Sequence, residues 1–191
     1  MIMKNRDATM DWVSYHQPMG NTKYLVLNST AAAGTSTTRW NDTTPGATLF
    51  TIGDTDKLNS DTVDYIAYVW APIKGYSSFG QYTGNGNANG SFAYTGFRPA
   101  FVMIKRTNHT TDWRMYDNTR LGYNVDNNDL AANTNAAEGT GDEIDLLSNG
   151  FKLRIGADAP NPLNGTSASY LYMAFAEFPF VSSNDVAGVA R

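Results

Sequence analysis

Short stretches with strand-like patterns of apolar and polar residues recur along the whole chain. In DWVSYH (11–16) and DWRMYD (112–117) apolar and polar residues alternate, as on a strand with one buried face. YIAYVWAPI (65–73) and YLYMAFAEF (170–178) are almost continuously apolar, which is typical of strands in the middle of a sandwich. IMKN (2–5) and VMIKR (102–106) are shorter apolar runs that end in polar or charged residues. All six are predicted strands.

These strands come in two similar copies. Adding 101 to a residue number in the window 4–15 gives five identities in twelve positions, two of them at aromatic residues that form repeat pairs. The identities are Lys4/Lys105, Thr9/Thr110, Asp11/Asp112, Trp12/Trp113 and Tyr15/Tyr116. Further along, Phe50 still matches Phe151 at 101, whereas Tyr65 matches Tyr170 at 105. Four residues were therefore added in one loop, which is where insertions are tolerated.

The second copy has a leading segment that the first copy lacks. Residues 79–101 precede its first shared strand, and they contain two more strand candidates, FGQYTG (79–84) and SFAYTGF (91–97). We therefore divide the chain into an N-terminally incomplete repeat at 1–78, a complete repeat at 79–180 and a C-terminal tail at 181–191. We expect the strand at 2–4 to be completed by a neighbour through β-strand addition, either by the tail of another copy or by a different protein. The rival explanation is a polypeptide that starts further upstream.

Composition supports an all-β fold. The chain has 21 Thr, 19 Asn and 17 Gly but only 3 Glu, which favours strands joined by tight turns. We predict two tandem β-sandwich repeats, jelly-roll-like, the first lacking its leading strands. Weak helical patterns occur only at 29–34 and 129–138.

Charge and residue usage exclude several classes of protein. The net charge is −4 with 14 basic residues and no basic run, so no nucleic-acid partner is expected. No apolar stretch reaches the roughly 20 residues of a membrane span, so no membrane insertion is expected. The chain has no Cys, which excludes disulfides and thiolate zinc sites.

A set of motifs in the second copy resembles a known family. The motifs are YTGNG (82–86), GFRPAFVMIKR (96–106), the DW pair, NGFKLR (149–154) and YLYMAFAE (170–177). Together they resemble a β-rich repeat domain of virion and tail-associated proteins of tailed bacteriophages, especially those of aquatic bacteria and cyanobacteria. The first copy departs from this pattern because it lacks the YTGNG segment.

The resemblance implies a virion structural protein on the exterior of the phage particle and supplies no catalytic residue. We expect a tail fibre, spike or other tail appendage, with a capsid decoration protein or head fibre as the alternative. A carbohydrate-binding module for host recognition is the second class. The expected partners are other virion proteins and host surface glycans, and a homo-oligomer is expected, a trimer if the protein is a fibre.

Aromatic residues are the main candidate site residues. Repeat-paired aromatics are expected to form the sandwich cores, with Trp12 and Trp113 mostly buried. The pairs are Trp12/Trp113, Tyr15/Tyr116, Phe50/Phe151 and Tyr65/Tyr170. Trp40 has no aromatic counterpart and lies among Arg39, Asn41 and Asp42, so it is either an exposed ligand or subunit contact or a cap on the end of the core.

Catalytic and metal sites have little support. The acidic loops at 54–56, 126–129 and 142–145 offer calcium ligands, but none has EF-hand spacing, and solvated turn residues are the preferred explanation. Glu177 has no repeat counterpart, since Pro72 takes its place, and His16 and His109 occupy different repeat positions. We therefore predict no enzyme, no cofactor and no metal site.

Overall fold

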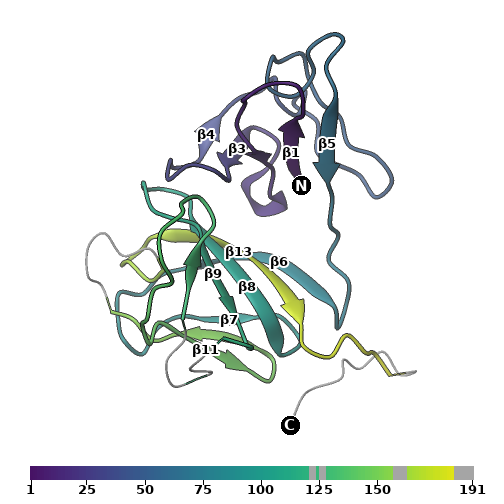
Figure 1. The fold of residues 1–191 in the computed structure, drawn as a ribbon. Coiled ribbons are helices and arrows are strands. Elements are labelled where there is room, and N and C mark those ends of the chain that lie inside the picture. The colour runs from purple at the N-terminus through teal and green to yellow at the C-terminus, as the bar shows by residue number, and fades with distance from the viewer. Residues whose placement is uncertain (121–123, 125–127, 157–162, 183–191) are drawn as a thin grey trace. The chain divides into compact units, whose positions relative to one another are not determined.

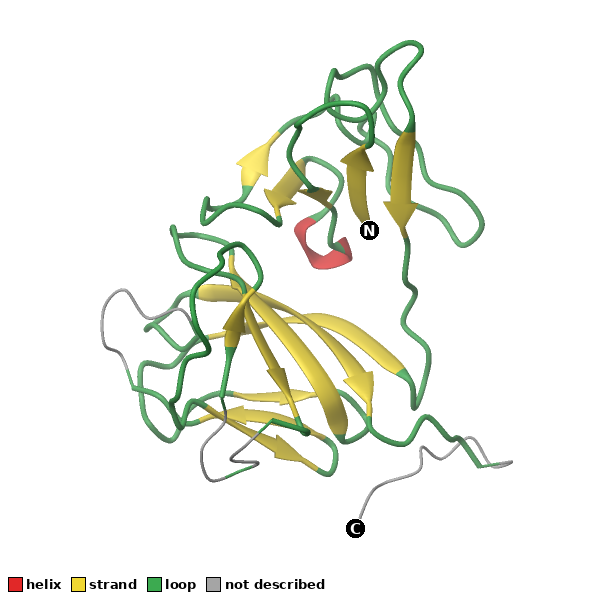
Figure 2. Cartoon of the chain, viewed as in Figure 1, coloured by secondary structure: helices red, strands yellow, loops and turns green. Residues whose placement is uncertain are grey.

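The structure, a computed structural model, describes residues 1–120, 124, 128–156 and 163–182. Within these residues the chain is all-β, with three antiparallel sheets and a single 3₁₀ turn, η1 (Gln17–Met19) (Figures 1 and 2). The predicted fold class is confirmed. The weak helical patterns at 29–34 and 129–138 were misleading, because both segments form irregular backbone and two-residue strands. No helix in this part of the chain is long and apolar enough to span a membrane.

The chain divides into two compact units, Met1–Trp70 and Ala71–Arg191. The repeat offsets place the boundary after residue 78, whereas the structure assigns 71–78 to the second unit. The reason is local, because Ile73 and Ser77 bond to each other and fold this segment onto the start of the next strand. The C-terminal residues 183–191, which include most of the predicted tail, lie outside the described residues.

The first unit contains one five-stranded sheet of order β4-β3-β2-β1-β5. Its strands are β1 (Ile2–Asn5), β2 (Val13–Ser14), β3 (Lys23–Val26), β4 (Gly34–Thr35) and β5 (Tyr65–Tyr68). Met3, Val13, Tyr15, Trp40 and Leu58 form the core on one face of this sheet. The first unit is therefore a single sheet covered by loops.

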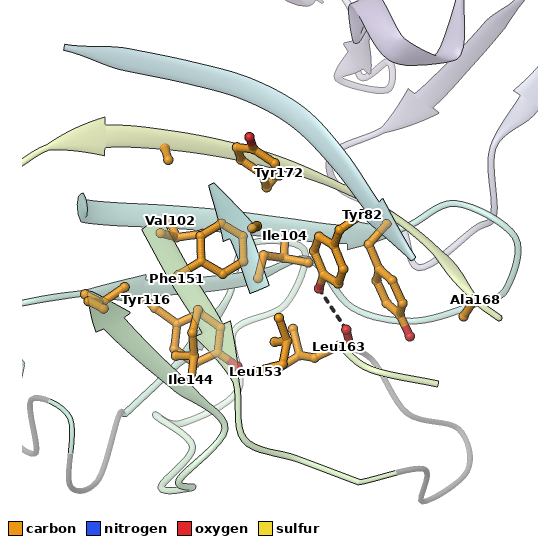
Figure 3. Packing of buried hydrophobic residues seen from close by; sticks show 14 of the residues in the cluster. Tyr82, Val102, Ile104, Tyr116, Ile144, Phe151, Leu153, Leu163, Ala168 and Tyr172 are labelled. Carbon is orange, nitrogen blue, oxygen red and sulfur yellow. Dashed lines mark hydrogen bonds between the residues drawn. The ribbon is translucent and has the colours of Figure 1, made fainter. Parts of the chain in front are cut away.

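The second unit is a two-layer sandwich. Its large sheet has the order β10-β9-β8-β13-β6 and its small sheet the order β11-β12-β7. The strands are β6 (Ser77–Thr83), β7 (Phe92–Tyr94), β8 (Pro99–Arg106), β9 (Arg114–Asp117), β10 (Leu130–Ala131), β11 (Ile144–Leu147), β12 (Gly150–Leu153) and β13 (Ser169–Ala176). Side chains from both sheets meet in one core, where Tyr82 stacks on Tyr170 at 4.9 Å and donates to the carbonyl of Leu163 (Figure 3).

The two five-stranded sheets share one strand register. Met3 pairs with Val13 in the first unit, and Ile104 pairs with Arg114 in the second, which is the same pair shifted by 101. Ile2 pairs with Tyr68 and Met103 with Met173, which are the positions given by offsets of 101 and 105. Strands β1, β2, β3 and β5 are thus the counterparts of β8, β9, β10 and β13.

Strands β6 and β7 have no counterpart in the first unit. In the second unit β6 flanks β13, and β7 belongs to the second layer. Residues 50–52, the counterparts of strand β12, carry no strand, and the part of the first unit that the structure describes has no second sheet.

The expected open strand is not β1. The prediction that 2–4 is completed by a neighbour is wrong, because β1 already pairs with β2 on one side and β5 on the other. The sequence located the missing strands correctly along the chain but assigned them to the wrong place in the sheet. In the second unit the leading strand β6 lies beside the last strand, β13, and not beside β8. The strand left at the edge of the first sheet is therefore β5.

The second unit buries a lysine in its large sheet. Lys105 on β8 is 0% exposed, and its Nζ donates to the carbonyl oxygen of Thr111 at 2.7 Å. Burial lowers the pKa of Lys105 to about 8, although the nearby Asp112 acts in the opposite direction. Its repeat counterpart, Lys4, is only partly buried and donates to the carbonyls of Asn5 and Ala8.

This lysine should make the second unit more stable in mild alkali. Above about pH 8 the folded chain has lost a proton that the unfolded chain keeps up to about 10.5, so the free energy of unfolding rises with pH. We expect a gain of about 1 kcal/mol between pH 7.5 and 9.0, measured by urea unfolding. The upper limit is set by the tyrosines. Burial raises the pKa values of Tyr82 and Tyr116, so at higher pH these side chains would ionise in the unfolded chain before they do in the folded one, which lowers stability.

Lys105→Met should remove most of this rise, and Lys4→Met serves as the matched control that should keep it. The remainder comes from the amine of Met1 in the first unit, because burial lowers its pKa to about 6. An equal rise in Lys105→Met would show that another group is responsible.

Candidate functional site

Trp40 is a core residue. Its side chain is 0% exposed, its ring contacts Tyr15 edge-on at 5.4 Å, and its Nε1 donates to the carbonyl oxygen of Lys23 at 2.9 Å. The expectation of an exposed Trp40 is therefore wrong, and the alternative of a cap on the core is correct. The prediction of exposure was based on the polar neighbours of Trp40. Asn41 and Asp42 are exposed in a turn with positive φ, whereas the ring of Trp40 packs against the face of the sheet that has no second layer.

Arg39 is the member of this loop that lies at a concave surface. A hollow of about 410 Å³ is lined by Met10, Ser36, Thr38, Arg39, Thr55, Asp56 and Lys57. The guanidinium of Arg39 stacks on Tyr24, with its Cζ 3.8 Å from the ring centroid. Lys57 pairs with Asp11, and this hydrogen bond holds the pKa of Asp11 below its ordinary value. The hollow therefore carries both signs of charge, because Asp56 lies in the same lining and Lys57 is already paired with Asp11.

An aromatic row crosses the opposite face of the first sheet. The rings of Trp12 and Tyr68 lie 6.4 Å apart and those of Tyr68 and Trp70 6.2 Å apart, with interplanar angles of 21° and 17°. Side chains alternate along strands, so Trp12 and Tyr68 point away from the core that their neighbours Val13 and Ala67 face. Tyr68 is 43% and Trp70 36% exposed. We call Trp12, Tyr68 and Trp70 the aromatic row.

The exposed apolar surface continues along β5 and the residues after it. Ile66 and Val69 are 38% and 55% exposed, on either side of Tyr68. Ile66, Tyr68 and Trp70, at alternate positions, form an exposed apolar strip at the edge of the sheet, and Val69 is exposed at the position between the last two. Contiguous exposed apolar patches on a protein of this size mark contact surfaces.

The repeat-paired aromatics occupy different environments in the two units. In the second unit the four expected core residues, Trp113, Tyr116, Phe151 and Tyr170, are all buried. In the first unit only Tyr15 is buried, and Trp12, Phe50 and Tyr65 are partly exposed. The second layer explains part of the difference, because Phe151 and Tyr170 pack between two sheets whereas Phe50 and Tyr65 have no second sheet above them.

The acidic loops are largely engaged with their own chain. Asp129 pairs with Arg114, Asp145 with Arg154, and Glu143 accepts a hydrogen bond from the hydroxyl of Tyr116. Among the described residues, no three His, Asp or Glu side chains gather as metal ligands would. Asp126, another calcium candidate, lies outside the described residues.

The remaining titratable candidates are Glu177, His16 and His109. Glu177, directly after β13, forms an ion pair with Arg98 at 3.1 Å. His109 is exposed in the loop after β8, and His16 is partly buried just before η1, in the other unit. Among the described residues, none of these three belongs to a cluster of metal-ligating side chains.

A protein-family profile matches almost the whole chain. It is described as a domain of unknown function, DUF7483, and the match covers residues 1–179. The chain belongs to this family. No curated protein and no solved structure is significantly similar to it. The match runs through both structural units, the single-sheet unit and the sandwich.

A pair of asparagines in this DUF7483 chain escaped the sequence analysis. The backbone N–H of Trp12 donates to Oδ1 of Asn28, and that of Trp113 donates to Oδ1 of Asn133, both at 2.8 Å. These hydrogen bonds tie the first DW segment to the residues just after β3 and the second to the residues just after β10.

The two asparagines are 105 residues apart, and β3 and β10 already correspond at this offset, because Val26 pairs with Val13 and Ala131 pairs with Arg114. The prediction of one four-residue insertion between residues 50 and 65 is therefore wrong, since the offset has already changed between β2 and β3. Carrying the offset of 105 back to residue 28 would have revealed the two asparagines.

The structure reverses the expected ranking of two tryptophans in the first unit. Trp40→Ala should lower the free energy of unfolding by about 3–5 kcal/mol, because it empties a fully buried site. Trp12→Ala should cost only about 1–2 kcal/mol, because the ring is partly exposed. Urea unfolding of the two variants tests this order. A larger loss in Trp12→Ala would mean that the aromatic row, rather than Trp40, holds the unit together.

Proposed function

We propose that the chain is a structural component on the exterior of a bacteriophage particle, in a tail fibre, spike or other tail appendage. The apolar strip along β5 carries the structural part of this proposal, since such a surface is suited to contact with another protein. The virion part is supported by the motifs of the second copy, from YTGNG (82–86) to YLYMAFAE (170–177), which resemble repeats of tail-associated proteins.

The proposed role is assembly and not catalysis. Ile66, Tyr68, Val69 and Trp70 present exposed apolar side chains in the last residues of the first unit. Burying such side chains against a partner contributes about 25 cal/mol per Å² of apolar surface. Other virion proteins and further copies of this chain are the proposed partners. The acidic net charge of −4 suits a protein that does not contact nucleic acid.

The location can be tested on particles of the phage whose genome carries this gene. Mass spectrometry of purified virions should detect the chain, and antibody labelling in electron micrographs should place it on the tail. Labelling of the head would favour a capsid decoration protein or head fibre. Absence from purified particles, with the chain present in infected cells, would overturn the proposal.

Glycan binding is a second candidate function, favoured by the aromatic row. Exposed, nearly parallel Trp and Tyr rings offer apolar faces together with polar edges, a combination that is enriched at recognition surfaces. The row lies on a sheet face, where a rigid backbone fixes the spacing of its rings. A tail appendage that recognises host surface glycans would combine both proposed functions.

A glycan array tests this candidate. The full chain should bind one glycan class, and Tyr68→Ala, which removes the central ring of the row, should weaken binding at least tenfold. Tyr76→Ala is the matched control, because Tyr76 is similarly exposed, at 45%, but belongs to the other unit. Binding to no glycan, or an equal loss in both variants, would refute the candidate.

A further inference from the structure

The first sheet ends in an edge strand, β5, that has none of the usual protections against pairing. The opposite edge strand, β4, has only two residues, and very short edge strands discourage pairing. Strand β5 has four residues, and its sequence YIAY contains no charged residue and no proline, which are the other common ways of blocking an edge. This edge is therefore suited to pairing with another strand.

The backbone of β5 has donors and acceptors that point out of the sheet. The N–H of Arg6 donates to the carbonyl of Asp64, and along an antiparallel ladder only alternate residues bond to the partner strand. The residues between them, Tyr65 and Ala67, therefore turn their backbone groups away from β1. Within the described residues, no backbone group bonds to these outward groups, and Ala67 is exposed.

The second unit shows that this position in the sheet accepts an antiparallel strand. The residues of β13 that correspond to Tyr65, Ala67 and Val69 each pair with a residue of β6. The third of them is Ala174, which pairs with Ser78, so the ladder on this side extends to the position of Val69, one residue beyond β5. Three residues of the first unit thus present their outer side to a further strand.

The side chains along this edge are complementary to those of a second β5. When two identical antiparallel strands pair about a two-fold axis, the central residue lies opposite its own copy. With Ala67 at the centre, Ile66 lies opposite Tyr68 on one face of the sheet, and Tyr65 lies opposite Val69 on the other. Each of these is a pair of a β-branched and an aromatic residue, a combination that stabilises antiparallel strands.

The neighbouring register is less favourable. Centring the pair on Ile66 would place Tyr68 opposite Asp64, whose side chain is charged and 78% exposed. The centre at Ala67 instead matches every apolar side chain of the edge with another apolar side chain. Because β5 carries no charge that would select a charged partner strand, a second copy of the same strand is the occupant that fits it best.

We propose that the chain forms a symmetric dimer in which β5 pairs in antiparallel fashion with β5 of a second copy, centred on Ala67. The two five-stranded sheets then join into one continuous sheet. The aromatic row lies on the face of Ile66 and Tyr68, so the rows of both copies lie on one face of the joined sheet. This proposal deepens the structural role proposed above, by naming a second copy as a partner, and rests on it for its biological setting.

Charged substitutions at Ala67 test the pairing and its symmetry. Ala67→Lys and Ala67→Glu each place two like charges directly opposite each other at the centre of the interface, which opposes pairing. Each variant alone should associate about tenfold more weakly than the parent chain. An equimolar mixture should associate again, as a heterodimer, because unlike charges then face each other. Ala67→Ser, which adds no charge, is the matched control and should associate like the parent chain.

Sedimentation equilibrium gives the readout. With rising concentration the parent chain should change from the 20.9 kDa of one chain to twice that mass and no further. Circular dichroism and urea unfolding would check that each variant folds, which is expected because Ala67 is exposed.

A disulfide tests the register. The chain has no Cys, so Ala67→Cys introduces a single thiol. Opposite residues of a hydrogen-bonded pair have Cα atoms about 5.5 Å apart, within the range that a disulfide spans, so mild oxidation with copper-phenanthroline should link this variant into a covalent dimer. Val69→Cys is the matched control and should not link, because Val69 lies opposite Tyr65, about 13 Å along the strand from its own copy.

Other outcomes would overturn the proposal. A parent chain that stays monomeric at every concentration would do so, and would leave the edge to a strand of another protein. Unchanged association of both charged variants would mean that the chain associates through a different surface. Association without linking of Ala67→Cys, or with equal linking of Val69→Cys, would exclude a pair centred on Ala67.

Two further points keep the test decisive. If a charged variant fails to fold, the disulfide experiment decides alone. None of these results bears on whether virions contain the chain, so the two proposals fail separately.

Discussion

Antiparallel pairing between the first and the last shared strand of each copy determines the organisation of both units. In the first unit this is the ladder of β1 with β5, and in the second the ladder of β8 with β13. Each ladder joins residues sixty or more positions apart and brings the intervening loops onto one sheet. The DW segments, held by Asn28 and Asn133, extend each sheet on the other side. The two units differ mainly in what packs against these shared strands, which is a second sheet in the second unit and loops in the first.

The sequence was a good guide to the ladder because a strand repeat leaves its register in the numbering. Offsets of 101 and 105, found from a few identities, are the offsets by which the paired residues of the two sheets correspond. Short strands such as β3, β4 and β10 were missed, because two to four residues carry too little alternation to be recognised. The position of β6 in the sheet could not be predicted from the sequence either, because β6 precedes β8 along the chain but lies beside β13 in the sheet.

Candidate site residues were harder to predict, since burial depends on which layers are present. Trp40 lies among polar residues, yet its ring fills part of a core that has no second sheet. Trp12 matches Trp113 in sequence and in its bond to an asparagine, yet it remains partly exposed and joins Tyr68 and Trp70. A pattern along the chain indicates which face of a strand a residue is on. It does not reveal what lies above that face.

The order of strands in the large sheet has a consequence for biosynthesis. Strand β13 lies between β8 and β6, although it is made last, and its partner Thr83 precedes Ser169 by 86 residues. Until β13 leaves the ribosome, β6 and β8 each have an edge whose backbone N–H and C=O groups lack the partner strand that they have in the folded unit. Contacts at such long sequence separation form slowly. A nascent chain that stalls before residue 169 would present two open edges to other nascent chains, so this unit depends on uninterrupted translation to escape aggregation.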